Sequence, residues 1–370
     1  MNCPMKIVVL SILALVLACV GVCAADVTPA NIPAASFSLI PPVVAARLPE
    51  QSKSKEALAI IKAADAGLKQ TPRAVPRVHT EGTLPHTGLW DTSQEAEKDW
   101  ALMLDLAFAF RLTGERRYLD AEDRLLNAWL DVYKLSYNPI DETKMDQIIL
   151  AYDLVAQSLP QSTRAKMNPF LSAMAAGYLD RIDKKLAAHK EDRANWQSHR
   201  IKLIVLAAYA VGDEALIARA EKAFRRQVSV NIHADGEVDD FAKRDALHYV
   251  TYDLDPLCVA AIAAKSHGHD WFHGPAAAPS LALAVDWLTP FALGEKKHEE
   301  FVHSKVGFDA ARARAGVKGF SGTWDPSHSI GLYQSASVLD PKYAAIEAQV
   351  IKNTGGNDRG WLTLLIKAGL

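Results

Sequence analysis

The stretch from Asp235 to Leu257 concentrates side chains that can transfer protons on an anionic substrate. After an Asp-Gly turn signal, Arg244, His248 and Tyr252 follow at steps of four, which places them on one helix face because a turn takes about 3.6 residues. Tyr249 lies one residue round from that row. A cation, an imidazole and two phenols exceed what the packing of an apolar helix requires. We therefore interpret this helix, predicted over 241–265, as part of a functional site.

A second group of polar residues stands at the start of another predicted helix, 195–211. Asn195, Trp196, Gln197, His199 and Arg200 precede an apolar run, LIVLAAYAV. Backbone N–H groups at a helix N-terminus favour anions, and an amide, an imidazole and a guanidinium add to this preference. We expect this helix start to bind the carboxylate of an acidic sugar.

Together, the two segments resemble the alginate lyase family. Asn195 to His199 reads N-x-x-S-H, and Ala246 to Leu257 reads A-L-x-Y-x-x-Y-x-L-x-P-L, which are similar to motifs of that family. The similarity is looser over WALMLDLAFAFRLTGERRY and NPIDETKMDQIILAYDL. The resemblance implies an α/α toroid and a lyase that cleaves polymers of uronic acids.

The resemblance also implies roles for individual residues. In the family, a His and a Tyr transfer protons, while an amide and an Arg hold the substrate carboxylate. His199 matches the His and Tyr252 the Tyr. The residue before the His is usually Asn, and here it is Ser198; the family's Arg, directly before Ala-Leu, is replaced by Asp245.

These departures leave the carboxylate-binding residue open. The amide role moves to Asn195 or Gln197. Arg244 is the candidate cation, although it precedes the family position by one residue, which is about 100° of helix rotation. We expect poly-mannuronate (alginate) as the first substrate, with β-1,4-glucuronan close behind because these departures indicate an altered substrate preference.

The chemistry that such residues serve is β-elimination. A base removes the proton on the carbon next to the carboxyl group, and an acid protonates the leaving oxygen, O4. A cation or a hydrogen-bond donor must stabilise the charge that grows on the carboxylate. His199 is the better base near neutral pH, and Tyr252 is an acid at its ordinary pKa. To act as the base, Tyr252 requires nearby cations such as Arg244 to lower its pKa.

Further side chains are expected to contact the substrate. Tyr249 also matches the motif and is a second candidate for the phenol role. His248 and Arg200 are expected to bind the acidic sugar. Trp90, in a Pro-broken segment, and Trp196 are expected to stack on sugar rings.

The elements that position these residues are predicted to be helices. Polar and apolar residues alternate over no sustained stretch, and helices recur in pairs with short turns such as Thr113-Gly114 and Gly212-Asp213. This pattern predicts an all-α fold, an incomplete (α/α) toroid of antiparallel helix hairpins, as one domain over residues 25–370. The sequence contains no Gly-rich nucleotide loop, zinc-ligand spacing or Gly-x-Ser-x-Gly elbow.

The first residues are typical of a secretory signal peptide. Lys6 gives a weakly basic start, residues 7–22 are almost wholly apolar, and Val22-Cys23-Ala24 offers small residues for cleavage, so residues 1–24 are the predicted signal. We expect a periplasmic or secreted protein with no membrane association after cleavage. The mature chain then keeps Cys258 alone, which excludes an intrachain disulfide.

Charge narrows the class of partner. The chain has 41 Lys and Arg residues against 43 Asp and Glu residues, which excludes a basic nucleic-acid coat and requires local cations in a groove if a polyanion binds. We expect a monomer that binds an anionic polysaccharide and uses no metal and no cofactor. The cluster of His267, His269 and His273 lacks a well-placed acidic partner, so we do not interpret it as a metal site.

Two other functions stay open from the sequence. One is a glycoside hydrolase on a similar helical toroid, with Glu237 or Asp239 and a second carboxylate as catalytic pair. The other is a non-catalytic periplasmic polysaccharide-binding protein with the same groove. Otherwise Glu237, Asp239 and Asp240 are interpreted as a solvated charge cluster at a helix start.

Overall fold

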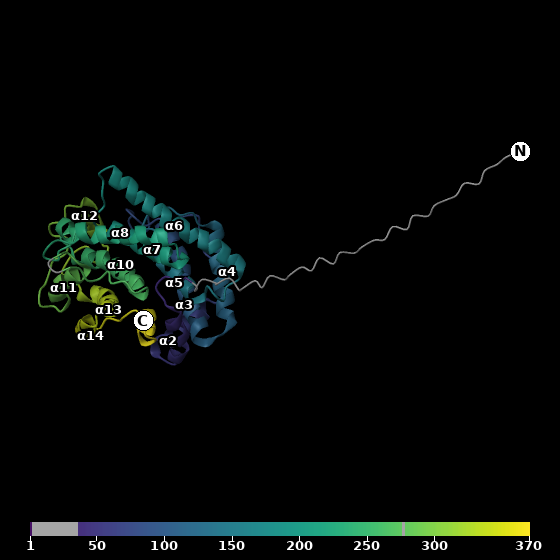
Figure 1. Ribbon diagram of the computed structural model, residues 1–370. Helices are drawn as coiled ribbons and strands as arrows, with labels where there is room; N and C mark the ends of the chain where they lie inside the picture. The colour runs from purple at the N-terminus through teal and green to yellow at the C-terminus, as the bar shows by residue number, and fades with distance from the viewer. Residues whose placement is uncertain (2–35, 276–277) are drawn as a thin grey trace. The chain divides into compact units, whose positions relative to one another are not determined.

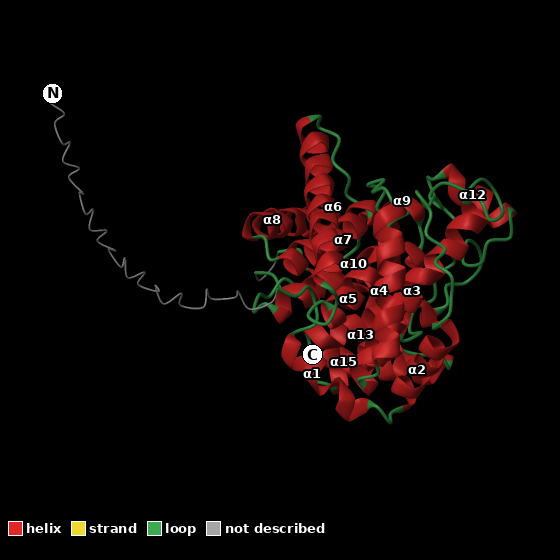
Figure 2. Ribbon diagram, turned by 90° about the vertical axis from the view of Figure 1, so that its right-hand side faces the viewer, coloured by secondary structure: helices red, strands yellow, loops and turns green. Residues whose placement is uncertain are grey.

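Helices supply the regular structure of residues 36–275 and 278–370, which are the part that the computed structural model describes, together with Met1. No β-strand occurs in these ranges, and Figure 2 shows helices joined by loops. The all-α prediction is confirmed. The predicted signal peptide, residues 1–24, lies outside the described residues.

Fifteen α-helices follow one another along the described residues, some joined by short turns and others by longer segments such as 68–89 and 293–306. The first eight are α1 (Pro42–Arg47), α2 (Lys55–Gly67), α3 (Trp90–Thr113), α4 (Arg116–Val132), α5 (Asp146–Val155), α6 (Gln161–Ala187), α7 (Asn195–Val211) and α8 (Glu214–Asn231). The others are α9 (Asp239–Arg244), α10 (Leu247–Ser266), α11 (Leu281–Ala292), α12 (Gly307–Arg314), α13 (Ile330–Leu339), α14 (Lys342–Thr354) and α15 (Gly360–Lys367). Three short 3-10 helices are η1 (Leu48–Gln51), η2 (Thr143–Met145) and η3 (Pro326–Ser329).

The helices form two layers. In the inner layer α3, α5, α7, α10 and α13 pack one against the next, and Figure 1 shows α7 and α10 side by side within it. The outer layer packs on them as hairpin partners: α2 and α4 on α3, α6 and α8 on α7, α11 on α10, and α14 on α13. The last helix, α15, packs on both α13 and α2. This two-layered arc of helix hairpins is the predicted (α/α) toroid.

The sequence of each helix accounts for its layer. In α7 every residue from Gln197 to Ala210 is buried, because apolar side chains surround a helix that has neighbours on all sides. In contrast, α8 is amphipathic, and its apolar stripe includes the buried Leu216, Ala220 and Phe224. The α7–α8 hairpin turns at Gly212, whose φ of 66° suits a residue without a Cβ atom.

One predicted helix is broken in the structure. The sequence predicts a continuous helix over 241–265, whereas Asp245 adopts a φ of 51° and separates α9 from α10. Arg244 therefore lies on α9, and only His248 and Tyr252 of the predicted row share α10. The prediction is wrong at this point because tertiary hydrogen bonds to Asp245, described below, stabilise a left-handed conformation that an isolated helix disfavours.

Candidate active site

Two cavities share lining residues on α10, and together they are called the groove below. The first, the Arg359 cavity, has a volume of about 460 Å³ and is lined by residues including Thr143, Lys144, His199, Lys202, His328 and Arg359. The second, the Trp90 cavity, has a volume of about 430 Å³ and is lined by residues including Trp90, Asn195, Trp196, Arg244, Tyr249 and Arg312. His248 and Tyr252 line both cavities. The two helix segments that the sequence singles out thus border the same groove.

His199 is buried beside the groove and is held by a threonine. Its Nδ1 atom lies 2.6 Å from Thr143 Oγ1, and its Nε2 atom is buried without a hydrogen-bond partner in the described residues. Burial and then the charge of Lys202 lower the pKa of His199 well below its usual value, and the backbone of Tyr252 partly opposes this shift. The imidazole is therefore neutral at pH 7, which is the form that a base requires.

Tyr252 lines both cavities and packs directly against His199, which lines the Arg359 cavity. Their ring centroids are 4.1 Å apart, and their planes are inclined by 49°. Burial raises the pKa of Tyr252 above its usual value, so its hydroxyl carries a proton at neutral pH. Pro256 lies within the same helix and has no N–H to donate to the Tyr252 carbonyl four residues earlier. Segments more than fifty residues apart in the sequence thus bring an imidazole and a phenol together.

The neighbours of Tyr252 on α10 also border the groove. His248 lines both cavities, and burial, followed by the charge of His328, lowers its pKa to about 4. The Tyr249 hydroxyl accepts a hydrogen bond of 2.8 Å from Arg312 Nη1. Burial raises the pKa of Tyr249, so this phenol is engaged and protonated.

Asn195 and Arg244 lie together at the edge of the Trp90 cavity, where a buried acid joins them. Asp240 Oδ2 accepts from the Asn195 backbone N–H at 2.7 Å and from its side-chain amide at 2.9 Å. Arg244 pairs with Asp240 at 3.4 Å and with Asp309 at 2.5 Å, and its guanidinium stacks 3.9 Å from the centre of the Tyr249 ring. Asp240 is 1% exposed, so its interpretation as a solvated charge is wrong.

Trp90 and Trp196 both line the Trp90 cavity, as a sugar-stacking role requires. Trp90 begins α3, and Trp196 stands in the first turn of α7. Two aromatic faces from separate elements therefore border the same half of the groove.

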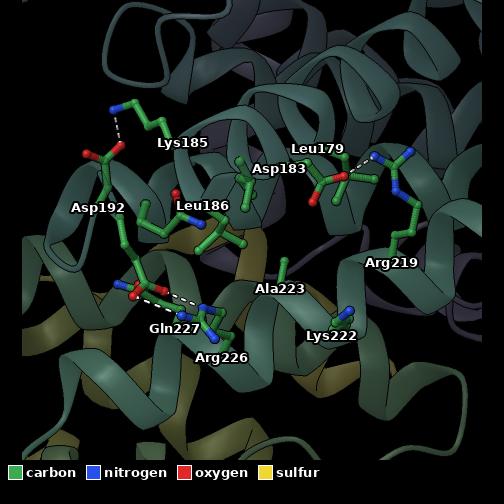
Figure 3. Close-up of a pocket in the computed structure, with 13 residues that line it drawn as sticks. Leu179, Asp183, Lys185, Leu186, Asp192, Arg219, Lys222, Ala223, Arg226 and Gln227 are labelled. Atoms are coloured by element: carbon green, nitrogen blue, oxygen red, sulfur yellow. Dashed lines mark hydrogen bonds and ion pairs between the residues drawn. The ribbon is translucent and has the colours of Figure 1, made fainter. Parts of the chain in front are cut away.

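Gln197 and Arg200 do not line the groove. Arg200 is buried, where its guanidinium donates to Gln197 and, at 3.1 Å, to Asp192. Gln197 instead lines a third cavity of about 240 Å³ between α6 and α8, where Lys185 pairs with Asp192 (Figure 3). The expectation that these two residues bind substrate in the groove has no support from their positions, because the helix turn carries them to the other side of α7.

Ser198, which stands where the family has Asn, is also turned away from the groove. Its hydroxyl donates to Asp253 Oδ1 at 2.5 Å, and Asn231 donates to Asp253 Oδ2 at 2.6 Å. Gln227 donates to the Ser198 hydroxyl at 3.1 Å. This buried network connects α7, α8 and α10, and it fixes the two helices that carry His199 and Tyr252.

Several residues that line the groove are not predicted as site residues from the sequence. Thr143 lies in the segment NPIDETKMDQIILAYDL, where the similarity to the family is loose, and His328, Arg312 and Arg359 come from segments without a recognisable motif. Lys202 stands in the polar helix start that drew attention to His199, and it donates to Asp146 Oδ2 at 2.6 Å. Lys202 follows His199 by three residues, and this spacing is the feature of the sequence that indicates a shared helix face.

His267 and Cys258, which the sequence also singles out, are packed within the fold and lie outside the groove. His267 is stacked between the rings of Phe37 and Tyr209, with centroid distances of 4.2 and 4.0 Å. Cys258 is buried as a free thiol. Across the described ranges, no group of three or more His, Cys, Asp or Glu side chains is arranged to hold a metal ion. In the same ranges, no helix combines the length and apolar character needed to cross a membrane.

Comparisons with known proteins identify a family and a similar fold. The family model described as "Alginate lyase" matches residues 43–298. An alginate lyase from Bacteroides ovatus, solved at 1.60 Å, aligns with a TM-score of 0.63 and 15% identity over 85% of this chain and 96% of that one.

Two structures of a histidine-to-alanine variant of alginate lyase A1-III also align with the chain. The unliganded form has a TM-score of 0.52 and 16% identity over 75% of this chain and 87% of that one. The form complexed with a tetrasaccharide has a TM-score of 0.52 and 15% identity over 82% of this chain and 88% of that one. A comparison with curated protein sequences gives no match. At these identities the structural similarity concerns the fold.

Proposed function

The chain belongs to the alginate lyase family, and we propose that it cleaves a 4-linked polyuronate by β-elimination, with His199 as base and Tyr252 as acid. Membership of this family supports a polysaccharide lyase that acts on alginate, and the similar fold agrees with it. Poly-mannuronate is the first proposed substrate and β-1,4-glucuronan the second. We further propose that the protein acts as a monomer after export to the periplasm or the medium.

The observation that carries the proposal is the distance of 4.1 Å between the rings of His199 and Tyr252, at the junction of two cavities. A sugar ring bound at this junction would contact Tyr252, and His199 lies directly behind the Tyr252 ring and borders the Arg359 cavity. The protonation states suit the roles, because His199 is neutral and Tyr252 is protonated at pH 7. A tetrasaccharide complex of alginate lyase A1-III supports an oligosaccharide as the ligand.

The proposed reaction proceeds as follows. With a proton on Nδ1 that is donated to Thr143 Oγ1, the Nε2 lone pair of His199 removes the C5 proton of a uronate. The electrons of that C–H bond form the C4–C5 double bond, and the bond between C4 and the bridging oxygen breaks. The Tyr252 hydroxyl donates its proton to that oxygen. The products are a chain with a new hydroxyl group and a chain that begins with an unsaturated uronate.

Proton return completes the cycle. After the reaction His199 holds one additional proton and Tyr252 is a phenolate, so a proton transfer from the imidazolium to the phenolate restores both groups. The short distance between the two rings allows this transfer directly or through one water molecule. No external oxidant or nucleophile is required.

The experiment is an assay of the purified mature protein against poly-mannuronate, poly-guluronate, β-1,4-glucuronan and hyaluronan. Ultraviolet absorbance detects the unsaturated ends, and a reducing-sugar assay counts all cleavage events. We expect equal numbers of both on at least one 4-linked polyuronate. Reducing ends without ultraviolet absorbance would identify a hydrolase. Binding without any new ends would identify a non-catalytic polysaccharide-binding protein, and either result would refute the proposal.

A further inference from the structure

The cations that line the groove differ in whether a carboxylate already neutralises them. Four of them have an acidic partner: Lys144 with Glu97 at 2.7 Å, Lys202 with Asp146 at 2.6 Å, Arg244 with Asp240 and Asp309 at 3.4 and 2.5 Å, and Arg359 with Asp255. Arg312 forms no ion pair with a carboxylate within residues 36–275 and 278–370. Its positive charge is therefore the one in this groove that remains uncompensated among the described residues.

Arg312 is held in a setting that suits a carboxylate. Its guanidinium lies 4.5 Å from the centre of the Phe308 ring and 4.9 Å from that of the Phe320 ring, and its Nη1 donates to the Tyr249 hydroxyl. Aromatic rings replace water around the cation and fix its orientation, which strengthens its attraction for an incoming anion. Arg312 lines the same cavity as Tyr252.

Arg244, the cation that the motif favours, is placed differently. Asp240 and Asp309 are both buried, and Arg244 is their shared partner. A substrate carboxylate bound to Arg244 would compete with two buried acids, and removal of Arg244 would leave both without their cation. Its position indicates a structural role in joining α9 to α12.

From these contacts we propose that Arg312 binds the carboxylate of the reacting uronate, in place of the family's arginine. The assignment rests on the proposed elimination at His199 and Tyr252. It moves the cation from the start of α10 to α12, which lies beyond the residues 43–298 that match the family model. The planar fork of the guanidinium matches a carboxylate, and its charge stabilises the negative charge that develops there as the C5 proton leaves.

Asp245, which occupies the family's arginine position, acts in this arrangement as a positioning residue. Its backbone carbonyl accepts from the Phe301 N–H at 2.8 Å and from His298 Nε2 at 2.9 Å, and its Oδ2 accepts from the His303 N–H at 2.9 Å. The left-handed φ of 51° at Asp245 is sustained by these contacts. The acid thus attaches the segment 298–303 that leads into α12.

Glu300 attaches the same segment to the start of α10. Its carboxylate accepts from the backbone N–H groups of Leu247 at 2.7 Å and His248 at 3.1 Å. One loop therefore caps the helix that carries Tyr252 and also leads into the helix that carries Arg312. Asp245 stands where the family has an arginine, and the loop that it helps to attach leads into the helix that supplies Arg312.

The test measures kcat and KM of Arg312→Gln on the polyuronate that the wild-type chain cleaves and on its methyl ester, which has no carboxylate charge. We expect kcat/KM on the free acid to fall about 10²- to 10³-fold, as for loss of one transition-state donor, with most of the loss in kcat. On the methyl ester the change should stay within threefold. Arg314→Gln, an exposed arginine on the same helix, is the matched control and should retain wild-type rates on both substrates.

A double-mutant cycle tests the role of Asp245. Asp245→Ala should reduce kcat/KM on the free acid, Asp245→Asn should restore it because the amide oxygen still accepts from the His303 N–H, and Asp245→Ala combined with Arg312→Gln should be no worse than Arg312→Gln alone. Additive losses would overturn the positioning role. A loss below threefold in Arg312→Gln, or an equal loss on the methyl ester, would overturn the carboxylate assignment alone. Absence of unsaturated ends with the wild-type chain would overturn the proposed function as well.

Discussion

Removal of one oxygen atom from Tyr252 separates catalysis from folding. Within the described residues, the Tyr252 hydroxyl makes no hydrogen bond to another side chain or to the backbone, and the ring packs against His199 at 4.1 Å. Tyr252→Phe keeps the ring and its packing and removes only the proton that the leaving oxygen requires. We expect unchanged stability together with a large loss of activity.

Tyr252→Phe should affect the catalytic rate far more than the stability of the fold. Loss of a general acid typically lowers a rate by about 10²- to 10⁴-fold, which corresponds to about 2.7–5.5 kcal/mol of transition-state stabilisation. The free energy of unfolding should change by less than about 0.5 kcal/mol, because no hydrogen bond to protein is lost and no apolar atom is removed. The loss should appear in kcat, since the proton is transferred only in the transition state.

The assay follows the ultraviolet absorbance of unsaturated ends, and urea unfolding gives the stability of each variant. Tyr209→Phe is the matched control, because the Tyr209 hydroxyl is buried, has no hydrogen-bond partner among the described residues and lies outside the groove. It should retain both activity and stability. Tyr252→Phe activity within tenfold of the wild type would refute the role of Tyr252 as acid. A destabilisation above 2 kcal/mol would refute the argument that its hydroxyl is free.

Three further predictions concern the surroundings of this pair. Burial and the charge of Lys202 lower the pKa of His199, so kcat/KM of the wild type should stay constant as the pH falls to 6.5 and decline only below that pH. Lys202→Gln should raise the pKa of His199 and move the decline to higher pH. Coincident pH profiles of the variant and the wild type would contradict this. Trp90→Ala and Trp196→Ala should each raise KM about three- to tenfold with little effect on kcat, as expected for the loss of about 0.5–1.5 kcal/mol of aromatic contact with the sugar. Initial rates over a range of substrate concentrations measure both constants, and a large fall in kcat would contradict the prediction. Asp253→Ala should lower the unfolding free energy by about 2–5 kcal/mol, because two buried donors lose their acceptor, and an unchanged urea midpoint would refute this.

Much of the framework of the site could be predicted from local sequence. The predicted helix 195–211 coincides with α7, since Gly212 ends it with a left-handed residue and polar residues mark its start. The motif resemblance predicts that His199 and Tyr252 share one site, and in the structure their ring centroids lie 4.1 Å apart with the planes inclined by 49°. Local capping signals and a family motif were therefore enough to predict helix bounds and site residues where the helix is regular.

The parts that could not be predicted depend on contacts between distant segments. The break at Asp245 requires hydrogen bonds from residues 298–303, more than fifty positions later, and no local turn signal announces it. Asp240 looked like a solvated acid, yet Asn195 and Arg244 enclose it. Whether a charged side chain faces solvent, a groove or a buried partner is decided by packing that a single sequence does not contain.

The distribution of charge in the groove explains how one site can bind a polyanion and still perform proton transfer. Burial keeps His199 neutral and Tyr252 protonated, so neither group carries the charge that draws the substrate in. Paired cations such as Lys202 remain attached to their own acids and orient neighbouring groups. Under the proposal, the attraction for a uronate carboxylate depends on Arg312, which forms no ion pair among the described residues and lies in the cavity that Tyr252 also lines. Because binding and proton transfer reside in different side chains, variants of Arg312 and Tyr252 should respond differently when the substrate carboxylate is masked.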